Sequence, residues 1–193
     1  MKQTRKNEDH MLIADAKKGS MEAFESLVRK YQKSIYYLCR IMTGTHQSAD
    51  DLSQETFVNA YFSLSSFKEG TNFFPWIRKI AVNKTLNYLK KRKREFPLDR
   101  STTEKTLNPG PQVNDKPLDT LHIQELNTKL RESIHGLPDE MKSVFVLKVF
   151  EDMSYKEISD TLNIPLGTVM SRLNRARQRL KSSLSEFLRG GTK

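Results

Sequence analysis

Residues 154 to 173, SYKEISDTLNIPLGTVMSRL, and the basic run NRARQR that follows at residues 174 to 179 form the most informative stretch of this sequence. Ser154 is of a type that commonly caps the start of a helix, and Asn163 is of a type that tolerates the left-handed backbone of a turn. Apolar residues recur at helical spacing before and after that turn. The stretch therefore predicts a short helix, a turn and a second helix, an arrangement that can place the second helix in the major groove of DNA.

The second helix of this pair, expected from about Leu166 to Leu188, has two different faces. At the start of such a helix the side chains reach base edges, and later arginines reach phosphates. The competing interpretation is a solvated basic helix that closes a bundle. The apolar residues, which should face the domain core, are Val169, Leu173, Ala176 and Leu180. The residues predicted to contact duplex DNA are Thr168, Ser171, Arg172, Arg175 and Arg179.

The composition points to a soluble protein that binds a polyanion. The chain of 193 residues has a formal net charge of +10 and 36% hydrophobic residues. Neutralised phosphates release counterions, so this charge favours nucleic acid, with an anionic membrane as the competing target. No apolar run approaches the roughly 18 residues that span a bilayer, and the N-terminus MKQTRKNEDHMLIADAKKG lacks the apolar segment of a secretion signal. We therefore expect a cytoplasmic protein with no membrane insertion of its own.

Cys39 is the only cysteine, and it lies among Ile35, Leu38 and Met42. A single cysteine cannot form an intramolecular disulfide or a multi-cysteine zinc site, and in such surroundings we expect a buried, inert thiol. The 4 histidines are scattered without metal-ligand spacing. The sequence offers no carboxylate cluster or nucleophile constellation that would support an enzyme. We therefore predict no catalytic residue, no metal and no cofactor.

Helical spacing of apolar residues recurs almost throughout, which predicts an all-α fold. Residues 96–117 lack this periodicity and hold most of the 7 prolines, so they are expected to form a flexible linker between two small helical domains. The expected organisation is an N-terminal tail at 1–11, a first domain at 12–94, a linker at 95–118, a second domain at 119–188 with its helix-turn-helix at 154–173, and a C-terminal tail at 189–193.

Local start and stop signals refine the expected helices. Gly19 is expected to separate two short helices, and Ser48 or Asp50 is expected to cap a later one. The later helices are expected at residues 31–43, 50–63, 73–94, 121–137, 139–150, 154–162 and 166–188. In the helix that begins at residue 139, the predicted core residues are Val144, Phe145, Leu147 and Val149.

The segment SADDLSQETFVNAY, residues 48 to 61, is locally acidic in an otherwise basic protein. Asp51 and Glu55 lie one helical turn apart with Gln54 beside them, and Phe57 and Tyr61 follow. Carboxylates near a helix N-terminus can form a solvated face that the helix dipole favours. The alternative is a surface on which a partner protein docks. The residues alone leave both interpretations open.

The helix expected at residues 73–94 ends in the basic run KKRKR. Aromatic, cationic and amide side chains on one face suit single-stranded nucleic acid through stacking, phosphate pairing and base-edge hydrogen bonds. Trp76 can instead belong to the core, and a basic run can simply be solvated. The polar stripe, at i, i+3, i+7, i+11 and i+14, consists of Trp76, Lys79, Asn83, Asn87 and Lys90.

Taken together, these segments resemble a known family. The strings DDLSQETFVNAY, FFPWIRKIAVNKTLNYLKKRKR and LPDEMKSVFVLKVFEDMSYKEISDTLNIPLGTVMSRLNRARQRL occur in this order, and the resemblance extends from about Leu12 to Leu188. The chain is similar to bacterial RNA polymerase sigma factors of the extracytoplasmic-function group. The resemblance implies a first domain that binds the clamp of the largest polymerase subunits and opens the −10 element. It implies a second domain that binds the −35 element as duplex and touches the polymerase flap. A stress or cell-envelope response and an anti-sigma protein as a further partner are also implied.

The resemblance assigns roles to individual residues. The loop at residues 65–72 matches a segment that captures a flipped base. Met170 and Asn174 stand where relatives often have a basic and sometimes an aromatic residue, and Phe74-Pro75-Trp76 replaces a more usual small-residue-Thr-Trp pattern. The residues implied to bind core polymerase are Asp50, Asp51, Gln54, Glu55, Phe57 and Tyr61. The residues implied for the −10 element are Phe67, Trp76, Lys79, Asn83, Lys84 and Asn87. A stand-alone helix-turn-helix regulator is the alternative function, although it would leave the acidic string unexplained.

Overall fold

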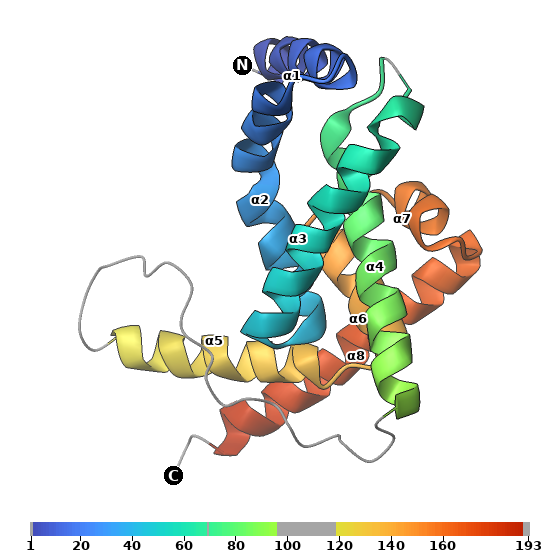
Figure 1. The fold of residues 1–193 in the computed structure, drawn as a ribbon. Coiled ribbons are helices and arrows are strands. Elements are labelled where there is room, and N and C mark those ends of the chain that lie inside the picture. The colour runs from blue at the N-terminus through green and yellow to red at the C-terminus, as the bar shows by residue number, and fades with distance from the viewer. Residues whose placement is uncertain (1, 69, 96–118, 191–193) are drawn as a thin grey trace. The chain divides into compact units, whose positions relative to one another are not determined.

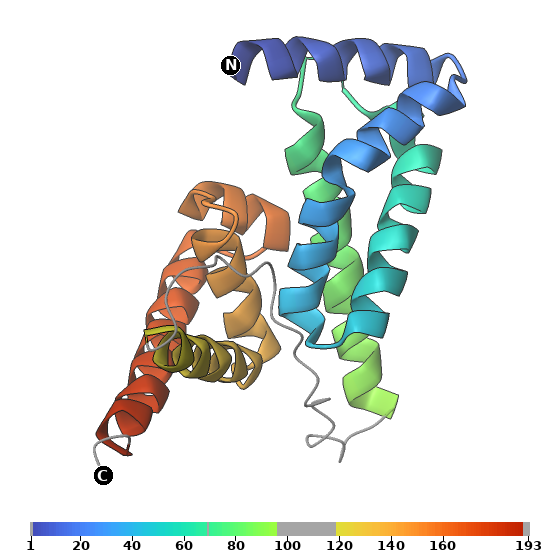
Figure 2. The same cartoon turned by 90° about the vertical axis from the view of Figure 1, so that its left-hand side faces the viewer.

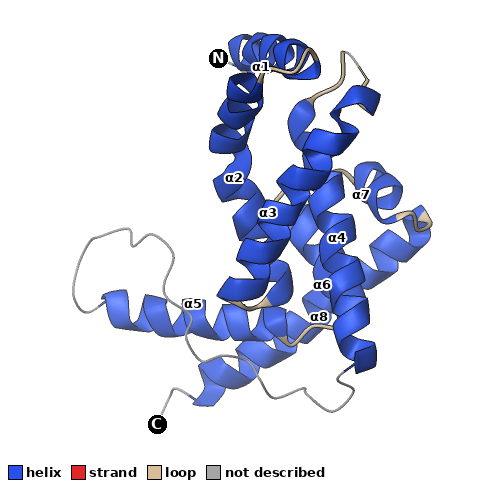
Figure 3. Cartoon of the chain, in the orientation of Figure 1, coloured by secondary structure: helices blue, strands red, loops and turns tan. Residues whose placement is uncertain are grey.

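The computed structural model of this chain describes residues 2–68, 70–95 and 119–190, and the regular structure in these ranges is entirely helical (Figure 3). The chain divides into two compact units, Met1–Glu95 and Phe96–Lys193. The predicted all-α fold with two helical domains is confirmed. The predicted linker lies outside the described residues except for its first residue, Glu95, which ends a helix. Within the described part of the chain, no helix is long and apolar enough to cross a membrane.

The first unit is a three-helix bundle with a fourth helix across one end. Helices α2 (Met21–Thr43), α3 (His46–Ser63) and α4 (Phe73–Glu95) pack against one another. A short 3-10 turn, η1 (Leu64–Ser66), follows α3. Helix α1 (Lys2–Lys17) contacts α2 and η1 and crosses the end of the bundle at a steep angle (Figures 1 and 2).

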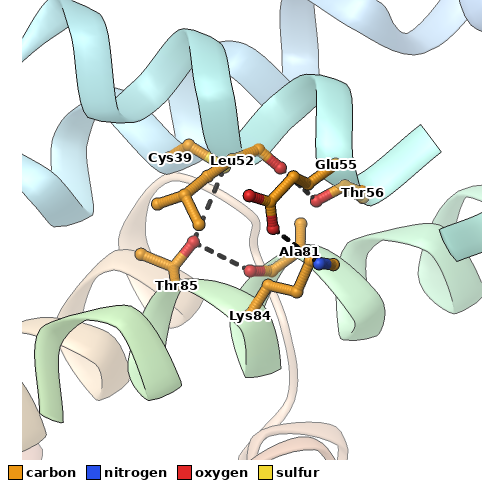
Figure 4. A network of polar contacts seen from close by, with 7 residues as sticks. All are labelled: Cys39, Leu52, Glu55, Thr56, Ala81, Lys84 and Thr85. Carbon is orange, nitrogen blue, oxygen red and sulfur yellow. Dashed lines mark hydrogen bonds and ion pairs between the residues drawn. The ribbon is translucent and has the colours of Figure 1, made fainter. Parts of the chain in front are cut away.

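The centre of this bundle contains the only cysteine. Cys39 is fully buried, and Thr85 of α4 donates a hydrogen bond to its Sγ atom at 3.6 Å (Figure 4). Burial raises the pKa of the Cys39 thiol to about 11, because the thiolate would lose its hydration. The thiol therefore stays protonated at neutral pH, which confirms the predicted buried and inert cysteine.

Two expectations for the N-terminal part are wrong. Residues 2–11 belong to α1 rather than to a tail. The carboxylate of Asp9 anchors this helix, because it is buried and accepts hydrogen bonds from Lys30 Nζ, at 2.7 Å, and from the Tyr31 hydroxyl. Gly19, with φ of 100°, does separate α1 from α2, but the helices that flank it are long.

Helix boundaries near residue 45 also differ from the expectation. Helix α2 runs without a break to Thr43 and ends at Gly44, which has φ of 85°. Helix α3 starts at His46 with Thr45 as its N-cap, so neither Ser48 nor Asp50 caps it. The Ser48 hydroxyl is instead engaged with Thr45 Oγ1 and with the Tyr88 hydroxyl, at 2.8 and 2.7 Å.

The second unit contains α5 (Asp119–His135), α6 (Asp139–Val149), α7 (Tyr155–Leu162) and α8 (Leu166–Gly190). Each of the first three contacts α8, and the side chains that meet there form the core. Val149 is 50% exposed and does not belong to this core, because α6 ends at that residue, beyond the fully packed turns. The fully buried side chains among the described residues of this unit are Val144, Val146, Leu147, Ile158, Val169, Leu173 and Ala176.

The predicted helix-turn-helix is present in α7 and α8. Ser154 and Glu157 form a reciprocal capping box at the start of α7, since the Ser154 hydroxyl accepts from Glu157 N and the Glu157 carboxylate accepts from Ser154 N. Asn163 ends α7 with φ of 51°, the left-handed conformation expected from the sequence. The turn is further held by the Ser159 hydroxyl, which donates to Ile164 O at 2.6 Å. Local chemistry therefore sets the angle at which α8 leaves α7.

Candidate protein and nucleic-acid interfaces

The exposed face of α3 carries the acidic residues singled out in the sequence. Asp50, Asp51, Gln54 and Glu55 are all exposed. The Gln54 side-chain amide donates to an Asp50 carboxylate oxygen at 2.9 Å. These groups remain hydrated and accessible, which is what a docking face for a basic partner surface requires. We call Asp50, Asp51, Gln54 and Glu55 the acidic face.

Two aromatic residues of α3 that are implied to bind polymerase, Phe57 and Tyr61, are less exposed than the acidic face. Phe57 is only 7% exposed, because it falls on the side of α3 that faces the bundle core, and its implied role in polymerase binding stays a prediction. Tyr61 is half-buried, and its ring packs edge-to-face with that of Phe24, with ring centroids 5.1 Å apart. The structure instead adds Val58 and Phe62, which are 54% and 77% exposed. They continue the acidic face at i+4 and i+8 from Gln54, a spacing that the sequence already contains.

The polar stripe on α4 lies on the surface. Lys79, Asn83, Asn87 and Lys90 are exposed, and Trp76 at the start of the helix is half-buried. The stripe therefore presents amide and ammonium groups to solvent along about three turns, with an aromatic ring at one end. Such a face can stack with a base and pair with the phosphates of a single strand.

Trp76 packs against a cluster of aromatic rings formed by Phe67 and Phe73. Phe67 is 3% exposed, and its ring packs edge-to-face with those of Trp76 and Phe73. The ring centroids are 5.1 Å apart for Trp76 and 6.0 Å apart for Phe73. The implied role of Phe67 in −10 binding stays a prediction, because a ring this deeply buried is not exposed for stacking on a nucleotide in this structure. The reason is that Phe67 fills the space between η1 and the start of α4. Residue 69 of the predicted base-capture loop lies outside the described residues.

Lys84 joins the two candidate surfaces of the first unit. Its ammonium lies 2.7 Å from a carboxylate oxygen of Glu55, and the pair connects α4 to α3 (Figure 4). The sequence assigned Glu55 to polymerase binding and Lys84 to DNA, and it contains no local signal that they meet. The pair links the acidic face of α3 to the side of α4 that follows Asn83, so both candidate surfaces lie on helices of one packed unit.

Helix α8 presents most of its predicted DNA contacts to solvent. Ser171 and Arg175 are exposed, Thr168 is half-buried, and Met170 and Asn174 lie exposed near them. Nothing lies within 4 Å of where a Cβ on Gly167 would be, so the start of the helix is open to a ligand. The N-terminal half of α8 is therefore accessible to duplex DNA.

Two of the arginines predicted to bind DNA, Arg172 and Arg179, lie beside residues of other helices of their unit. The Arg172 guanidinium donates to a Glu140 carboxylate oxygen of α6 at 2.8 Å, and its side chain is 25% exposed. Arg179 lines a shallow cavity of about 360 Å³ beside α5, together with Ser133 and Leu137. Arg179 lies about 16 Å from Thr168 along the axis of α8, at a rise of ~1.5 Å per residue. Its contact with DNA remains a prediction.

Comparisons with known proteins identify the family. Models of Sigma-70 region 2 and Sigma-70 region 4 match residues 27–95 and 127–180. Over 179 residues the chain is 36% identical to the ECF RNA polymerase sigma factor SigW of Bacillus subtilis. The matched residues cover 91% of this chain and 96% of SigW. This chain belongs to the ECF sigma factors. The RNA polymerase sigma-H factor of Pseudomonas aeruginosa is 31% identical, with 94% of this chain and 96% of that protein covered.

Solved structures share the fold of this sigma factor. The sigma factor RpoE of Bartonella quintana, in complex with the anti-sigma factor NepR, aligns with a TM-score of 0.67 at 22% identity, covering 86% of this chain and 98% of that one. CnrH, in complex with the cytosolic domain of CnrY, aligns with a TM-score of 0.63 at 23% identity, covering 93% and 98%. At these identities the likeness concerns the fold. Helix α1 lies outside both family-model matches.

Proposed function

We propose that this sigma factor is a dissociable subunit that binds core RNA polymerase and directs it to promoters. The observation that carries the proposal is the arrangement of the first unit, where an acidic face for a protein partner and a polar stripe for a single strand lie on two helices that pack together. The second unit adds a helix-turn-helix for duplex DNA. We propose that regions 2 and 4 correspond to these two units. A factor that must hold a polymerase, a melted strand and an upstream duplex needs these three surfaces together.

The polar stripe of α4 is assigned to the melted −10 element. Bases that unstack from the duplex would be captured against Trp76 and hydrogen-bonded by Asn83 and Asn87, while Lys79 pairs with phosphate. A base stacked on an aromatic ring is worth about 1–3 kcal/mol, so capture of a base on Trp76 offsets part of the cost of opening the base pairs. Opening of the promoter then follows from binding, without a chemical step by this chain.

The N-terminal half of α8 is assigned to the −35 element. Thr168 and Ser171 lie near the start of the helix, where side chains of this motif reach base edges, and Arg175 follows at a position suited to phosphate. Because the two promoter elements are read by two units of one chain, occupancy of one element raises the local concentration of the other reader. Catalysis in this scheme belongs to the polymerase, and this chain is not an enzyme.

The partners follow from the same assignment. Core polymerase and promoter DNA are in the cytoplasm, and we propose that this protein acts there. The two solved relatives are recorded in complexes with CnrY and with the anti-sigma factor NepR. We propose an anti-sigma protein as a further partner here, and a role in a stress or cell-envelope response.

Reconstitution with core polymerase tests the proposed function. Promoter-specific transcripts are expected only when this protein and core enzyme are both present, on promoters selected from genomic DNA by the reconstituted holoenzyme. The stand-alone regulator predicts the opposite result. A tight promoter footprint by the protein alone, together with an inactive core enzyme, would exclude the sigma-factor mechanism.

Arg172 gives a sharper test of the −35 assignment. Replacement by alanine is expected to weaken −35 binding by about 1–3 kcal/mol, mainly for the native sequence, if its guanidinium leaves Glu140 to contact a base. Arg175→Ala should weaken binding equally for all DNA sequences. It should also reduce the slope of log affinity against log salt concentration by about 1. Binding of full-length protein variants in holoenzyme to native and scrambled −35 duplexes measures both.

Glu140→Gln is the control for the Arg172 prediction. It removes the ion pair and leaves the guanidinium, so −35 affinity should be unchanged or higher. A loss as large as that of Arg172→Ala would mean that the pair only holds α6 against α8. An Arg172→Ala loss equal on both duplexes would make Arg172 a phosphate contact.

A further inference from the structure

Lys17, the last residue of α1, reaches the segment that supports Trp76. Its ammonium donates a hydrogen bond to the backbone carbonyl oxygen of Phe67 at 2.7 Å, across 50 positions of sequence. Ile13 and Ala16 on the same helix are 4% and 5% exposed, so apolar packing holds this end of α1 in place. We propose that Lys17 is a positioning residue for −10 recognition, which it serves by fixing Phe67 under the Trp76 ring. The proposal rests on the proposed function of the polar stripe.

The Phe67 carbonyl needs such a partner. Phe67 follows η1 with extended backbone, φ of −66° and ψ of 124°, so its carbonyl oxygen is not part of a helical hydrogen-bond ladder. A backbone acceptor at a buried residue is costly to leave without a partner. The Lys17 ammonium provides a charge-assisted hydrogen bond, which is about twice as strong as a neutral one. The contact therefore fixes the backbone at a point where regular structure does not.

The position of Phe67 determines the surroundings of Trp76. The Phe67 ring lies edge-on to Trp76, with centroids 5.1 Å apart, and both rings contact Phe73. A shift of the Phe67 backbone would therefore move the surface on which the half-buried indole rests. The exposed part of that indole is the part available to a base.

Helix α1 is also linked to the start of α4 through Tyr31 of α2. Asp9 accepts a hydrogen bond from the Tyr31 hydroxyl, and the Tyr31 ring stacks on Phe74 with centroids 5.3 Å apart and planes 18° apart. The same ring lies 5.6 Å from that of Phe73. Asp9, through Tyr31, and Lys17, through Phe67, thus link α1 to the aromatic residues that begin α4. Lys17 is the attachment on the side of Trp76.

Intrinsic fluorescence of the full chain tests the positioning directly, because Trp76 is the only tryptophan. Lys17→Met keeps the apolar stem and removes the donor, and it should increase quenching of Trp76 by acrylamide. Lys17→Arg, which restores a cationic donor, should behave like wild type. Lys18→Met is the matched control, since Lys18 is the neighbouring residue, its side chain is 80% exposed, and its ion-pair distance to Asp15 is 3.9 Å. Unchanged quenching in Lys17→Met would overturn the proposal.

Holoenzyme binding tests the consequence for −10 recognition. The probes are a single-stranded oligonucleotide with the non-template −10 sequence of a selected promoter and a scrambled oligonucleotide of the same composition. Lys17→Met should reduce the preference for the native oligonucleotide by about five-fold, the effect of one hydrogen bond, with core affinity unchanged. The thermal midpoint should fall slightly, because the Phe67 carbonyl loses its partner. Equal losses on both oligonucleotides, with or without a lower midpoint, would make Lys17 a folding residue only. If wild-type holoenzyme shows no preference, the proposed function of the stripe fails, whereas the fluorescence result still decides the role of Lys17.

Discussion

Replacing Gln54 and Glu55 together by alanine is expected to weaken binding to core RNA polymerase by about 10- to 100-fold, the effect of losing a small cluster of interface hot-spot residues. Both side chains are exposed on α3, so their removal leaves no cavity and the bundle should keep its thermal midpoint. The −35 affinity of the second unit should not change, because its DNA contacts come from α8. Titration of fluorescently labelled protein with core enzyme in the absence of DNA measures the loss.

Two controls separate docking from the ion pair that Glu55 makes with Lys84. Lys84→Met breaks the same pair and leaves the acidic face intact, so core affinity should stay near wild type. Glu25→Ala removes an exposed carboxylate of α2 that pairs with Arg29, outside the acidic face, and should have no effect. Equal core affinities for the double variant and wild type would refute the assignment of this face to polymerase.

Leu173→Ala is expected to destabilise the second unit by about 2–5 kcal/mol, the usual cost of emptying a fully buried leucine site. Leu173 is 1% exposed on α8, where α5, α6 and α7 all pack. A small domain is stable by only about 5–15 kcal/mol in total, so this loss is a large share. The unfolding transition of the second unit should move to a lower temperature and −35 binding should fall with it, while core binding through the first unit persists.

Leu188→Ala is the matched control, because it removes the same side chain from the same helix at a position that is 62% exposed. Calorimetry and circular dichroism of the full chain should show almost no change for this variant. If Leu173→Ala and Leu188→Ala gave equal midpoints, α8 would not be the central helix of its unit.

Much of the candidate sites could be predicted from helical spacing. The polar stripe of α4 and the N-terminal half of α8 lie on the surface as their periodicity indicated, because a regular helix places residues three and four apart on one side. The acidic face is exposed for the same reason. Spacing alone does not say where such a stripe ends, and this is why Val58 and Phe62 were missed although they extend the acidic face at the same interval.

Phe57 and Phe67 show the limit of that argument. An aromatic residue beside a polar stripe can belong to the surface or to the core, and the helical phase that decides it depends on which neighbours pack against it. Phe57 faces the bundle and Phe67 fills the space under Trp76. The ion-pair partners of charged residues also depend on how helices pack. Arg172 of α8 pairs with Glu140 of α6, and Lys84 of α4 pairs with Glu55 of α3.

The sequence by itself determined the helix-turn-helix and the two helices that carry the candidate interfaces of the first unit. These depend on interactions between residues a few positions apart, such as the Ser154 capping box and the left-handed turn at Asn163. The tertiary structure alone decided the burial of the two phenylalanines and the partners of the charged residues. It also decided the attachment of α1 through Lys17 to the carbonyl of Phe67. The physical reason is that such contacts join residues distant along the chain, and their partners are set only when whole helices pack.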